Sequence, residues 1–584
     1  MTKYFTALLM FFVVWPSFAA DLNGYTAQYE CRAGGAYCNV DVVSLGERTC
    51  DQTIKASTPW SSINWSSNTI CIEAGDHTSK GTLTIPSSAN GKPGNYKVLR
   101  YYRADDSDDE PWNQSGANRA TLRNLNVQGS FWIIHRLSFD SNYVLLGGST
   151  VEVSTGSVCD DNIINRILVE KSGSIGGVRF RDDCSRNTLQ NSVIRLPKIA
   201  PGSDINSVDI DRADNTVIVN NELIDAGHGI GVEDSSLSTN ALIVENNDIY
   251  KNPALFTDCS GNFTPNNEDS PCVAGESAVS FKGGAQPGTA NTIKVIHNRL
   301  WNTRKSDLNT CCAGGSNGFL MTISTASLNP ASNVLVQNNI LMSGQFGIAT
   351  VRPGHEKISI IGNLLYRIHK FNSGIRNVVF ATGSDMNLGE VYLNTVISAT
   401  DYWGSLPNTN SDWRCNVYID AGAPEKSVGS GSQHDNNVFY GSTPFTTGKT
   451  NKDIPLTTRA NSKAYALNQI IRTSATPTTA CVKGTESACF LYRVIQAGMS
   501  LNSAPSYCTT LGCIVNDGEM TVQAIRGPYT FRRKLRTVSG GETVAIPYVR
   551  PYVDPNNIQS SAPEAGACPS NYAGRTGIGV NDSN

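Results

Sequence analysis

The residues Val217 to Ile224 read VIVNNELI, and the same phrase returns four times further along the chain. The copies are Leu242 to Ile249 (LIVENNDI), Ile293 to Leu300 (IKVIHNRL), Val334 to Leu341 (VLVQNNIL) and Ile358 to Leu365 (ISIIGNLL). They share the residues Asn221, Asn247, Asn298, Asn339 and Asn363, which are 26, 51, 41 and 24 residues apart. Such repetition is typical of a solenoid. The two shorter steps fit one coil each, and the two longer steps fit either one coil with a long loop or two coils.

A second set of short strands accompanies this phrase. Its members are Val178 to Arg181, Val208 to Asp211, Ile230 to Glu233, Val279 to Lys282 and Ile348 to Val351. Apolar and polar residues alternate in them, as in strands, and helical periodicity is nearly absent. Asparagine suits the bends between strands because it tolerates left-handed backbone angles and its amide can bond to the coils above and below. The sequence therefore predicts an all-β chain that folds as a right-handed parallel β-helix of about ten coils.

The start of the chain is typical of an exported protein. Lys3 is followed by the apolar run from Phe5 to Val14 and by small residues at Ser17, Ala19 and Ala20, which is the order of a secretory signal peptide. We therefore expect residues 1–20 to be removed and the protein to be secreted.

The cysteines agree with export. All 16 follow residue 20, and several lie in close pairs, which predict disulfides: Cys31/Cys38, Cys259/Cys272, Cys481/Cys489 and Cys508/Cys513.

The net charge of −3 provides no basic field for nucleic acid. After residue 20, no stretch approaches the roughly 18 to 20 unbroken apolar residues of a membrane helix. We expect a monomer that binds neither nucleic acid nor a membrane, and any anionic ligand must be recognised by charges that are grouped locally.

The region before the repeats carries a family resemblance. Its segments are Thr69 to Asp76 (TICIEAGD), Gly81 to Ile85 (GTLTI), Gly91 to Arg100 (GKPGNYKVLR), Ala120 to Leu125 (ATLRNL) and Trp132 to Phe139 (WIIHRLSF). Together with the repeats, they resemble the pectate-lyase-like superfamily of right-handed parallel β-helices over about residues 65–445. The resemblance implies the fold more than the chemistry, because this solenoid serves lyases, hydrolases, epimerases, esterases and adhesins.

Four segments are expected along the chain. After the signal peptide, residues 21–64 form an N-terminal cap and residues 65–445 form the β-helix. Residues 446–584 form a C-terminal cap or a small β module. The cysteines predict that disulfides are concentrated in these terminal caps.

Strand alternation sorts the second set of strands into two faces. If Val178, Phe180 and their counterparts point inward, the outward residues are Arg179, Arg181, Asp209, Asp211, Glu233, Ser280 and Lys282, with Arg212 and Asp234 just beyond. Later coils are expected to place Met321, Ala349 and Val351 outward, so charge is not the rule for this face. One interpretation of the charged stripe is a solvated face of paired charges, and the other is a functional site.

The functional interpretation is a calcium-assisted elimination. Asp209, Asp211, Glu233 and Asp234 offer hard oxygen ligands to Ca²⁺, and Lys282 is the candidate base for the weakly acidic C5 proton of a uronate. The resemblance implies the same pairing, since family 9 of the polysaccharide lyases combines a calcium pocket with a lysine base. The segment Glu276 to Gly284 (ESAVSFKGG) resembles that family's lysine-bearing strand, although Ser280 stands where an acidic residue would be expected.

The residues predicted to bind an acidic polysaccharide are Arg181, Arg212, His228, Arg299 and Arg304. Arg299 and Arg304 are equally plausible as structural ion-pair partners. Two alternatives remain open. Gly227-His228-Gly229 resembles a turn of polygalacturonase-like hydrolases, in which Asp209, Asp211 and Asp234 would form the acid and base group. A carbohydrate-binding adhesin would need no catalytic residue.

Overall fold

A computed structural model describes residues 46 and 48–551, with gaps. The gaps of eight or more residues are 103–110, 147–158, 197–204, 233–240, 282–292, 307–317, 369–377, 423–432, 443–453 and 474–490. The described helical segments are short 3₁₀ turns: η2 (Trp60–Ser62), η3 (Thr78–Lys80), η4 (Pro111–Asn113), η5 (Gly116–Asn118) and η6 (Pro253–Leu255). In this part of the chain, no helix is both long and apolar enough to cross a membrane.

Three long sheets, which we call A, B and C, account for most of the strands. In spatial order, sheet A contains β1 (Gln52–Ile54), β2 (Thr69–Glu73), β5 (Lys97–Tyr102), β8 (Trp132–His135), β11 (Ile163–Asn165), β14 (Thr188–Gln190), β17 (Thr216–Val219), β20 (Leu242–Glu245), β25 (Ile293–Ile296), β29 (Ser332–Gln337), β32 (Glu356–Ile361), β35 (Asn387–Tyr392), β38 (Asp412–Arg414) and β40 (Gln433–Asp435). Sheet B contains β3 (Gly75–Asp76), β6 (Ala120–Leu122), β9 (Ser138–Phe139), β12 (Leu168–Glu170), β15 (Val193–Arg195), β18 (Glu222–Ile224), β21 (Asp248–Tyr250), β26 (Arg299–Trp301), β30 (Ile340–Met342), β33 (Leu364–Tyr366), β36 (Thr395–Ile397), β39 (Val417–Gly422), β41 (Val438–Ser442) and β42 (Ile454–Pro455).

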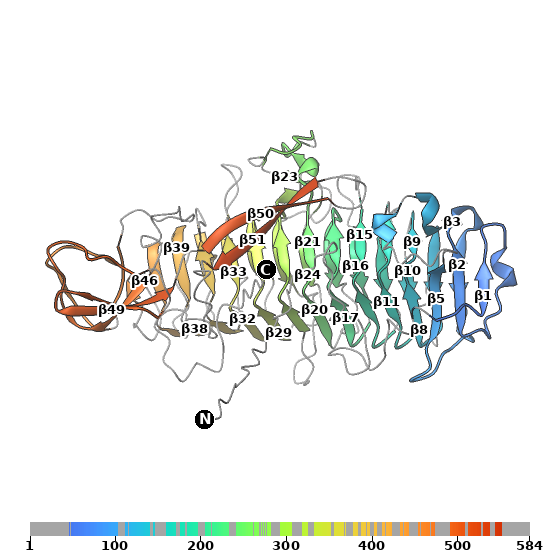
Figure 1. Cartoon of the computed structure of the whole chain (residues 1–584), viewed down its shortest axis with the longest axis horizontal. Coiled ribbons are helices and arrows are strands. Elements are labelled where there is room, and N and C mark those ends of the chain that lie inside the picture. The colour runs from blue at the N-terminus through green and yellow to red at the C-terminus, as the bar shows by residue number, and fades with distance from the viewer. Residues whose placement is uncertain are drawn as a thin grey trace, which may run out of the picture.

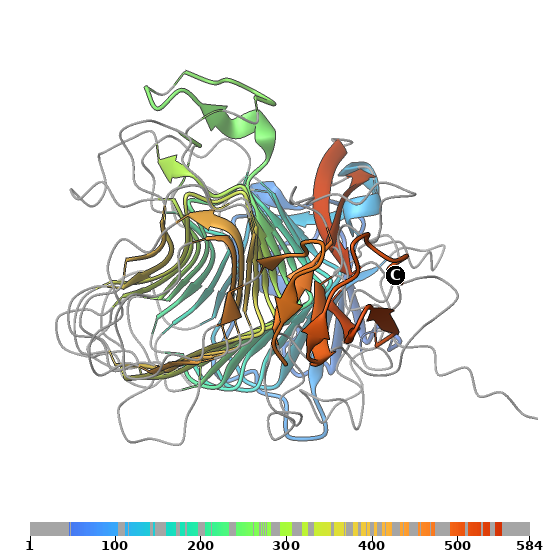
Figure 2. The same cartoon turned by 90° about the vertical axis from the view of Figure 1, so that its left-hand side faces the viewer.

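Sheet C contains β4 (Thr82–Ile85), β7 (Asn124–Val127), β10 (Val144–Leu146), β13 (Val178–Phe180), β16 (Asn206–Ile210), β19 (His228–Val232), β24 (Ser277–Phe281), β28 (Phe319–Ser324), β31 (Phe346–Val351), β34 (Val378–Thr382) and β37 (Tyr402–Ser405). Successive strands of the chain pass from sheet A to B to C and back to A, and neighbours within a sheet run parallel. The chain therefore winds into the right-handed parallel β-helix that the repeats predicted, seen from the side in Figure 1 and along its axis in Figure 2.

The β-helix is longer than the sequence predicted. In the described part of the chain, sheets A and B each have fourteen strands and sheet C has eleven, against about ten expected coils, so the additional strands lie in incomplete coils at the ends. Sheet A already begins at β1, inside the segment expected to be a cap, and sheet B ends at β42, beyond residue 445. The terminal coils were missed because they lack the repeated asparagine phrase.

The turn from sheet A to sheet B is built on the predicted asparagines. The backbone N–H and the side-chain amide of Asn221 both donate to Oδ1 of Asn247, at 2.9 and 3.0 Å. Asn247 donates in the same way to Asn298, so the 51-residue step is one coil with a long loop. The ladder continues through Asn339, Asn363, Asn394, Asn416 and Asn437, each bonded to the next. The last three of these were not recognised in the sequence.

Two neighbouring residues divide the roles that the sequence assigned to one asparagine. The ladder residue makes the bonds between coils, and the residue before it takes the left-handed backbone angle. That preceding residue is Asn220 (φ 56°), Asn246 (φ 54°), His297 (φ 58°), Asn338 (φ 57°) or Gly362 (φ 66°). Asparagine is favoured here because it tolerates these angles. The doubled asparagines of the phrase thus have a structural reason.

Replacing one asparagine of the ladder tests how much its hydrogen bonds contribute to the free energy of unfolding. Asn247→Ala leaves buried donors of Asn221 without their acceptor, and we expect the free energy of unfolding to fall by about 2–4 kcal/mol. The exposed Asn95 lies on the same β-helix, and Asn95→Ala is expected to change stability by less than about 0.5 kcal/mol. Denaturant unfolding of both variants measures the difference; equal stability of the two would show that the ladder bonds contribute little.

The interior of the coil is a continuous apolar core that runs from Ile54 to Tyr418. The inward assignment of the sheet C strands is confirmed, since Val178, Phe180 and their counterparts belong to this core. The prediction that Met321 points outward is wrong, because Met321 pairs with Val279 and is fully buried in the core. Leu320 is also a core residue. Two consecutive side chains therefore face inward at the start of β28, which shifts simple alternation by one residue.

Four disulfides lie within the described residues. Cys259–Cys272 and Cys508–Cys513 confirm two of the predicted close pairs. Cys50–Cys71 and Cys159–Cys184 each join consecutive coils of the β-helix. Disulfides are therefore found in the β-helix as well as near its ends. Cys31, Cys38, Cys481 and Cys489 lie outside the described residues.

A small β module follows the last coil. Its main sheet has the order β43 (Thr457–Thr458), β45 (Ile470–Arg472), β46 (Leu491–Gln496), β49 (Met520–Arg526) and β48 (Ile514–Asp517). Two further strands, β44 (Ala464–Tyr465) and β47 (Gly498–Met499), form a pair beside it. The module has its own apolar core around Tyr492 and Val522. Figure 1 shows it at the end of the β-helix, beyond β38 and β39.

One buried ion pair lies at the centre of this module. Arg459 donates to both carboxylate oxygens of Asp517, at 2.7 and 3.0 Å, and Tyr507 donates to the same carboxylate at 2.5 Å. The backbone N–H of Leu501 completes the set at 2.9 Å. The charges are therefore paired and hydrogen-bonded, as burial requires.

Two histidines are buried in the N-terminal coils. His77 accepts from Lys80 at Nδ1 and lies 2.9 Å from the backbone oxygen of Glu73 at Nε2, which fits a neutral ring protonated at Nε2. Burial lowers the pKa of His77. Asn165 donates to Nδ1 of His135, and burial, with a smaller contribution from nearby arginines, holds the pKa of His135 well below its usual range.

These histidines predict sensitivity to acid. Because the unfolded chain binds protons at them more readily than the folded chain, stability is fully present above about pH 6.5 and falls as the pH drops below it. We expect the decline in unfolding free energy from pH 7 to pH 5 to be smaller in His135→Gln than in the unmodified protein. Denaturant titrations across this range provide the measurement, and equal slopes would contradict the assignment.

Candidate functional site

The outer face of sheet C changes character along the β-helix. One column of outward residues, aligned by strand register, runs through Arg179, Asp209, Gly231, Ser280, Thr322 and Ala349. Its first two members are charged and the following four are small and uncharged. The predicted stripe of charge is therefore confined, in this column, to β13 and β16.

The charges on these two strands are closely paired. Arg179 Nε donates to Asp209 Oδ2 at 2.7 Å, and Arg181 Nη2 lies 3.6 Å from the same oxygen. The Asn206 amide donates to Oδ1 at 3.1 Å. A Cβ at Gly231 would overlap the Asn206 amide, at 2.5 Å, so this position of the next coil must stay free of a side chain. These three side chains carry two positive charges and one negative charge, and Asp211 follows in the register of Arg181.

The two arginines differ in their access to solvent. The Asp209 side chain is 4% exposed and that of Arg179 is 14% exposed, whereas Arg181 is 33% exposed. Arg181 is therefore the member of the group that a ligand can reach. Asp209, which is covered, positions the arginines.

Several predicted site residues lie at the edge of this face. Asp211 follows β16 directly, in the register of Arg181, and its backbone N–H donates to Phe180 O. Arg212, Glu233, Asp234 and Lys282 lie outside the described residues.

His228 opens β19 and is paired in register with Asn206, which bonds to Asp209. Its side chain is buried, with 3% of the residue exposed. His228 therefore lies on the coil that follows Asn206, where Gly231 and not His228 is the residue opposite Asp209.

The structure does not bring Arg299 or Arg304 to this face. Arg299 belongs to β26 in sheet B, where it pairs with Asp248 through bonds of 2.5 and 2.6 Å. Arg304 is buried against the Phe256 ring, 3.9 Å from its centroid, and donates to the Ser270 carbonyl. Arg299 makes the structural ion pair that the sequence had left as an alternative, whereas Arg304 makes a structural contact of another kind, with a carbonyl and an aromatic ring. Strand alternation identified neither the sheet nor the partner.

Arg304 supports a small projection between sheets B and C. The projection contains β22 (Phe256–Thr257), β23 (Cys272–Val273) and β27 (Lys305–Ser306), which form a three-stranded sheet. Figure 1 shows it standing out from the β-helix at the label β23, and Figure 2 shows it in green above the β-helix.

Sequence reasoning missed an aromatic pair at the start of two neighbouring strands of sheet C. Phe319 and Phe346 pair in register on β28 and β31, and their ring centroids are 4.6 Å apart with a tilt of 31°. Phe319 is buried, with 7% of the residue exposed, and Phe346 is partly buried. The pair therefore packs within the protein and offers little ring surface to a ligand. A phenylalanine at the start of each of two consecutive strands would have been the sequence signal.

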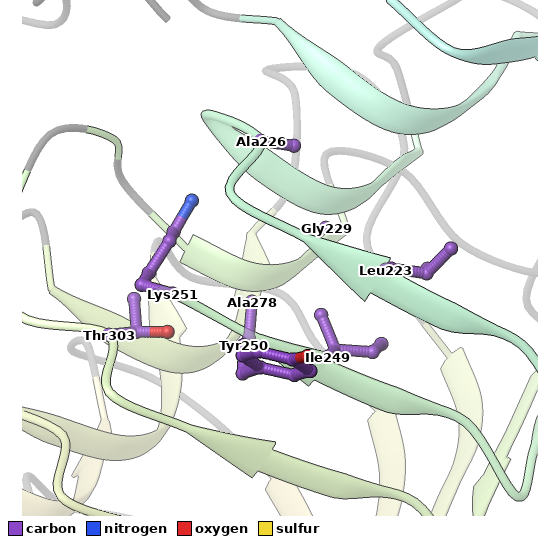
Figure 3. A pocket seen from close by; sticks show the side chains of 8 residues that line it. All are labelled: Leu223, Ala226, Gly229, Ile249, Tyr250, Lys251, Ala278 and Thr303. Atoms are coloured by element: carbon purple, nitrogen blue, oxygen red, sulfur yellow. The ribbon is translucent and has the colours of Figure 1, made fainter. Parts of the chain in front are cut away.

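A cavity beside β19 is not a second candidate. Leu223, Tyr250, Lys251, Thr303 and four further residues line this cavity, which has no room for a water molecule (Figure 3). Ligand pockets are far larger, roughly 300–1,000 Å³. The Lys251 ammonium donates to the Gly227 carbonyl at 3.1 Å, which fits a structural role at this corner.

The described residues fit calcium only in part. Asp209 already satisfies two arginines and an amide, and a cation at this carboxylate would be repelled by both guanidinium groups. Within the part of the chain that the structure describes, no three His, Cys, Asp or Glu side chains are grouped as metal ligands. A calcium site that includes Asp209 does not fit this geometry, so Asp211, Glu233 and Asp234 are the remaining proposed ligands.

Comparisons with known proteins give likenesses of fold. No family model and no curated protein matches the sequence. Among solved structures, the chain is similar to alginate lyase from Paenibacillus sp. str. FPU-7 (17% identity, TM-score 0.36, 57% of this chain and 98% of that one) and to pectate lyase Pel9A (12%, 0.32, 55% and 77%). It is also similar to a GH87 alpha-1,3-glucanase from Streptomyces thermodiastaticus strain HF3-3 (10%, 0.35, 66% and 64%). At these identities and TM-scores, the likenesses say nothing about this chain's reaction.

The role of Asp209 can be tested through stability. Asp209→Asn leaves Arg179 and Arg181 without their counter-charge, and we expect the free energy of unfolding to fall by about 2–4 kcal/mol, with or without calcium. Asp161→Asn is a matched control, because Asp161 pairs with the exposed Arg186 and such pairs contribute at most about 1 kcal/mol. Denaturant unfolding with calcium or with chelator is the measurement. A calcium-dependent stabilisation that disappears in Asp209→Asn would instead identify Asp209 as a ligand.

Proposed function

We propose that this protein binds an acidic polysaccharide along the outer face of sheet C and cleaves it by β-elimination. The observation that carries the proposal is the group of Arg179, Asp209 and Arg181, whose most accessible member, Arg181, can receive a carboxylate. Guanidinium groups suit this task because they bind carboxylates through paired donors. Ser280 and Thr322, in the column beyond Asp209, are buried, so Arg181 is the accessible point of this face.

The proposed reaction begins at the C5 proton of a uronate. A base removes this proton, the C4–O bond breaks, and a C4=C5 double bond forms while the leaving oxygen takes a proton. Lys282 is the proposed base and must be neutral to accept the proton, a state that neighbouring positive charge favours. If Asp211, Glu233 and Asp234 hold a calcium ion, that ion would supply neutralisation of a uronate carboxylate.

Arg181 and the proposed base belong to different coils. Arg181 follows Phe180, whose aligned counterparts on the next three strands of sheet C are Ile210, Val232 and Phe281. Phe180 and Phe281 are therefore three strand spacings apart, about 14 Å, which is too large for one sugar. Since Lys282 follows Phe281 in the sequence, the proposal gives Arg181 a uronate elsewhere on the bound polymer, and Arg181→Ala is expected to weaken binding more than turnover.

The proposed base is tested by incubating the purified protein with a panel of polyuronates and following ultraviolet absorbance of unsaturated products. We expect Lys282→Ala to lower turnover by about 100-fold or more while folding and retention on the polymer persist. Lys294→Ala is the matched control, because Lys294 is exposed on β25 of sheet A in the next strand of the chain. An unchanged rate in Lys282→Ala would remove the base assignment, and turnover that resists chelation would remove the calcium.

The same panel separates the other two functions. New reducing ends without absorbance that disappear in Asp211→Ala would identify a glycoside hydrolase. Retention on the polymer with neither product would identify a binding protein. In both alternatives, the Arg181 group keeps its role in recognising carboxylates.

A further inference from the structure

The hairpin after the C-terminal module has a charge unlike that of the rest of the chain. Its strands, β50 (Tyr529–Thr537) and β51 (Thr543–Pro551), contain Arg532, Arg533, Lys534, Arg536 and Arg550 and no acidic residue. The whole chain carries a net charge of −3. Positive charge is thus concentrated in two nine-residue strands of a chain that is otherwise acidic.

The pairing of the two strands does not compensate this charge. Register places Arg532 opposite Tyr548, Lys534 opposite Ile546 and Arg536 opposite Val544. Every residue opposite one of the five cations is uncharged. Arg532, Lys534 and Arg536 also stand at alternate positions in the sequence of β50. Like charges at such short spacing repel one another, and an anionic ligand relieves this repulsion.

The hairpin is also separate from the other sheets. In the described part of the chain, β50 and β51 pair only with each other. A two-stranded hairpin is marginally stable on its own in water, so it gains from a ligand that spans both strands. Figures 1 and 2 show the hairpin along the flank of the β-helix on the side of sheet B, and not beyond its end. It therefore lies on a different face from sheet C.

We propose that this hairpin, β50 with β51, is a second binding element for the acidic polysaccharide; the identity of the polymer rests on the proposed function. The hairpin holds a stretch of polymer that is not in contact with sheet C. Holding one stretch raises the local concentration of the others at the cleavage face, without any change at the reacting sugar. The element then increases affinity for long chains and leaves the turnover of short oligomers unchanged.

The test removes three cations from the hairpin of the full chain. The variant Arg532→Ser/Lys534→Ser/Arg536→Ser is compared with Lys55→Ser/Lys92→Ser/Lys463→Ser, which makes the same change in net charge at exposed positions elsewhere. Affinity electrophoresis in gels that contain polygalacturonate or alginate measures retention at several salt concentrations. We expect the hairpin variant to lose at least tenfold in affinity and to depend less on salt, and the control variant to stay within twofold of the unmodified protein.

Several results would overturn the proposal. Equal losses in the two variants would show an effect of net charge alone. A lower melting temperature with unchanged retention would show that the cations are paired within the chain. Loss of retention on double-stranded DNA without loss on polyuronate would assign the hairpin to another class of polymer.

The two proposals fail independently. If the protein cleaves no polyuronate but the hairpin variant loses retention, the proposed function fails and the binding element stands. If the protein cleaves polyuronates and the hairpin variant is retained normally, the binding element fails and the proposed function stands. Turnover of soluble short oligomers by the hairpin variant, expected to equal that of the unmodified protein, shows whether the cleavage face is intact.

Discussion

One asparagine amide at the turn between sheets A and B connects each coil of the ladder to the next. Its oxygen accepts two bonds from the preceding coil and its nitrogen donates to backbone carbonyls, so few buried polar groups at the turn are left unpaired. Because each of these turns has the same geometry, the strands that follow begin in the same register. The two coils that carry Arg179 and Asp209 precede this ladder and have Ile167 and Ser192 at the same turn. The Ile167 N–H donates to the Ser192 hydroxyl, and the Ser192 N–H donates to Asn221, so these coils join the ladder at its first asparagine.

The same constraint explains how much of the fold could be read from the sequence. Asn221 to Asn363 stand in a phrase with aliphatic residues on both sides, so their spacing revealed the coil. Asn394, Asn416 and Asn437 occupy the same ladder at steps of 31, 22 and 21 residues, but their surroundings differ from the phrase. The hydrogen bond between coils requires only the asparagine and a preceding residue whose backbone allows the turn. A search for the whole phrase therefore underestimated the length of the β-helix.

The site was harder to predict because alternation gives the face of a strand and nothing more. It correctly placed Arg179 and Asp209 outward, yet it could not show that they bond to each other across coils. That pairing depends on the register between two strands, about which the pattern within either strand carries no information. Arg299 was expected near the same face, but the sequence did not show that its strand belongs to sheet B. Met321 was wrongly placed outward, because Leu320 and Met321 are consecutive residues that both belong to the core.

The outer face of sheet C changes along the axis of the β-helix. On β13 and β16 it carries two arginines around a covered carboxylate, and on the following strands the same column is formed by small residues. Ser280 and Thr322 are buried, with 4% and 8% of each residue exposed, whereas the Arg181 side chain is 33% exposed. Arginine recognises a carboxylate through paired donors. Recognition of a charged ligand at this face therefore depends on Arg181 more than on the small residues that follow it.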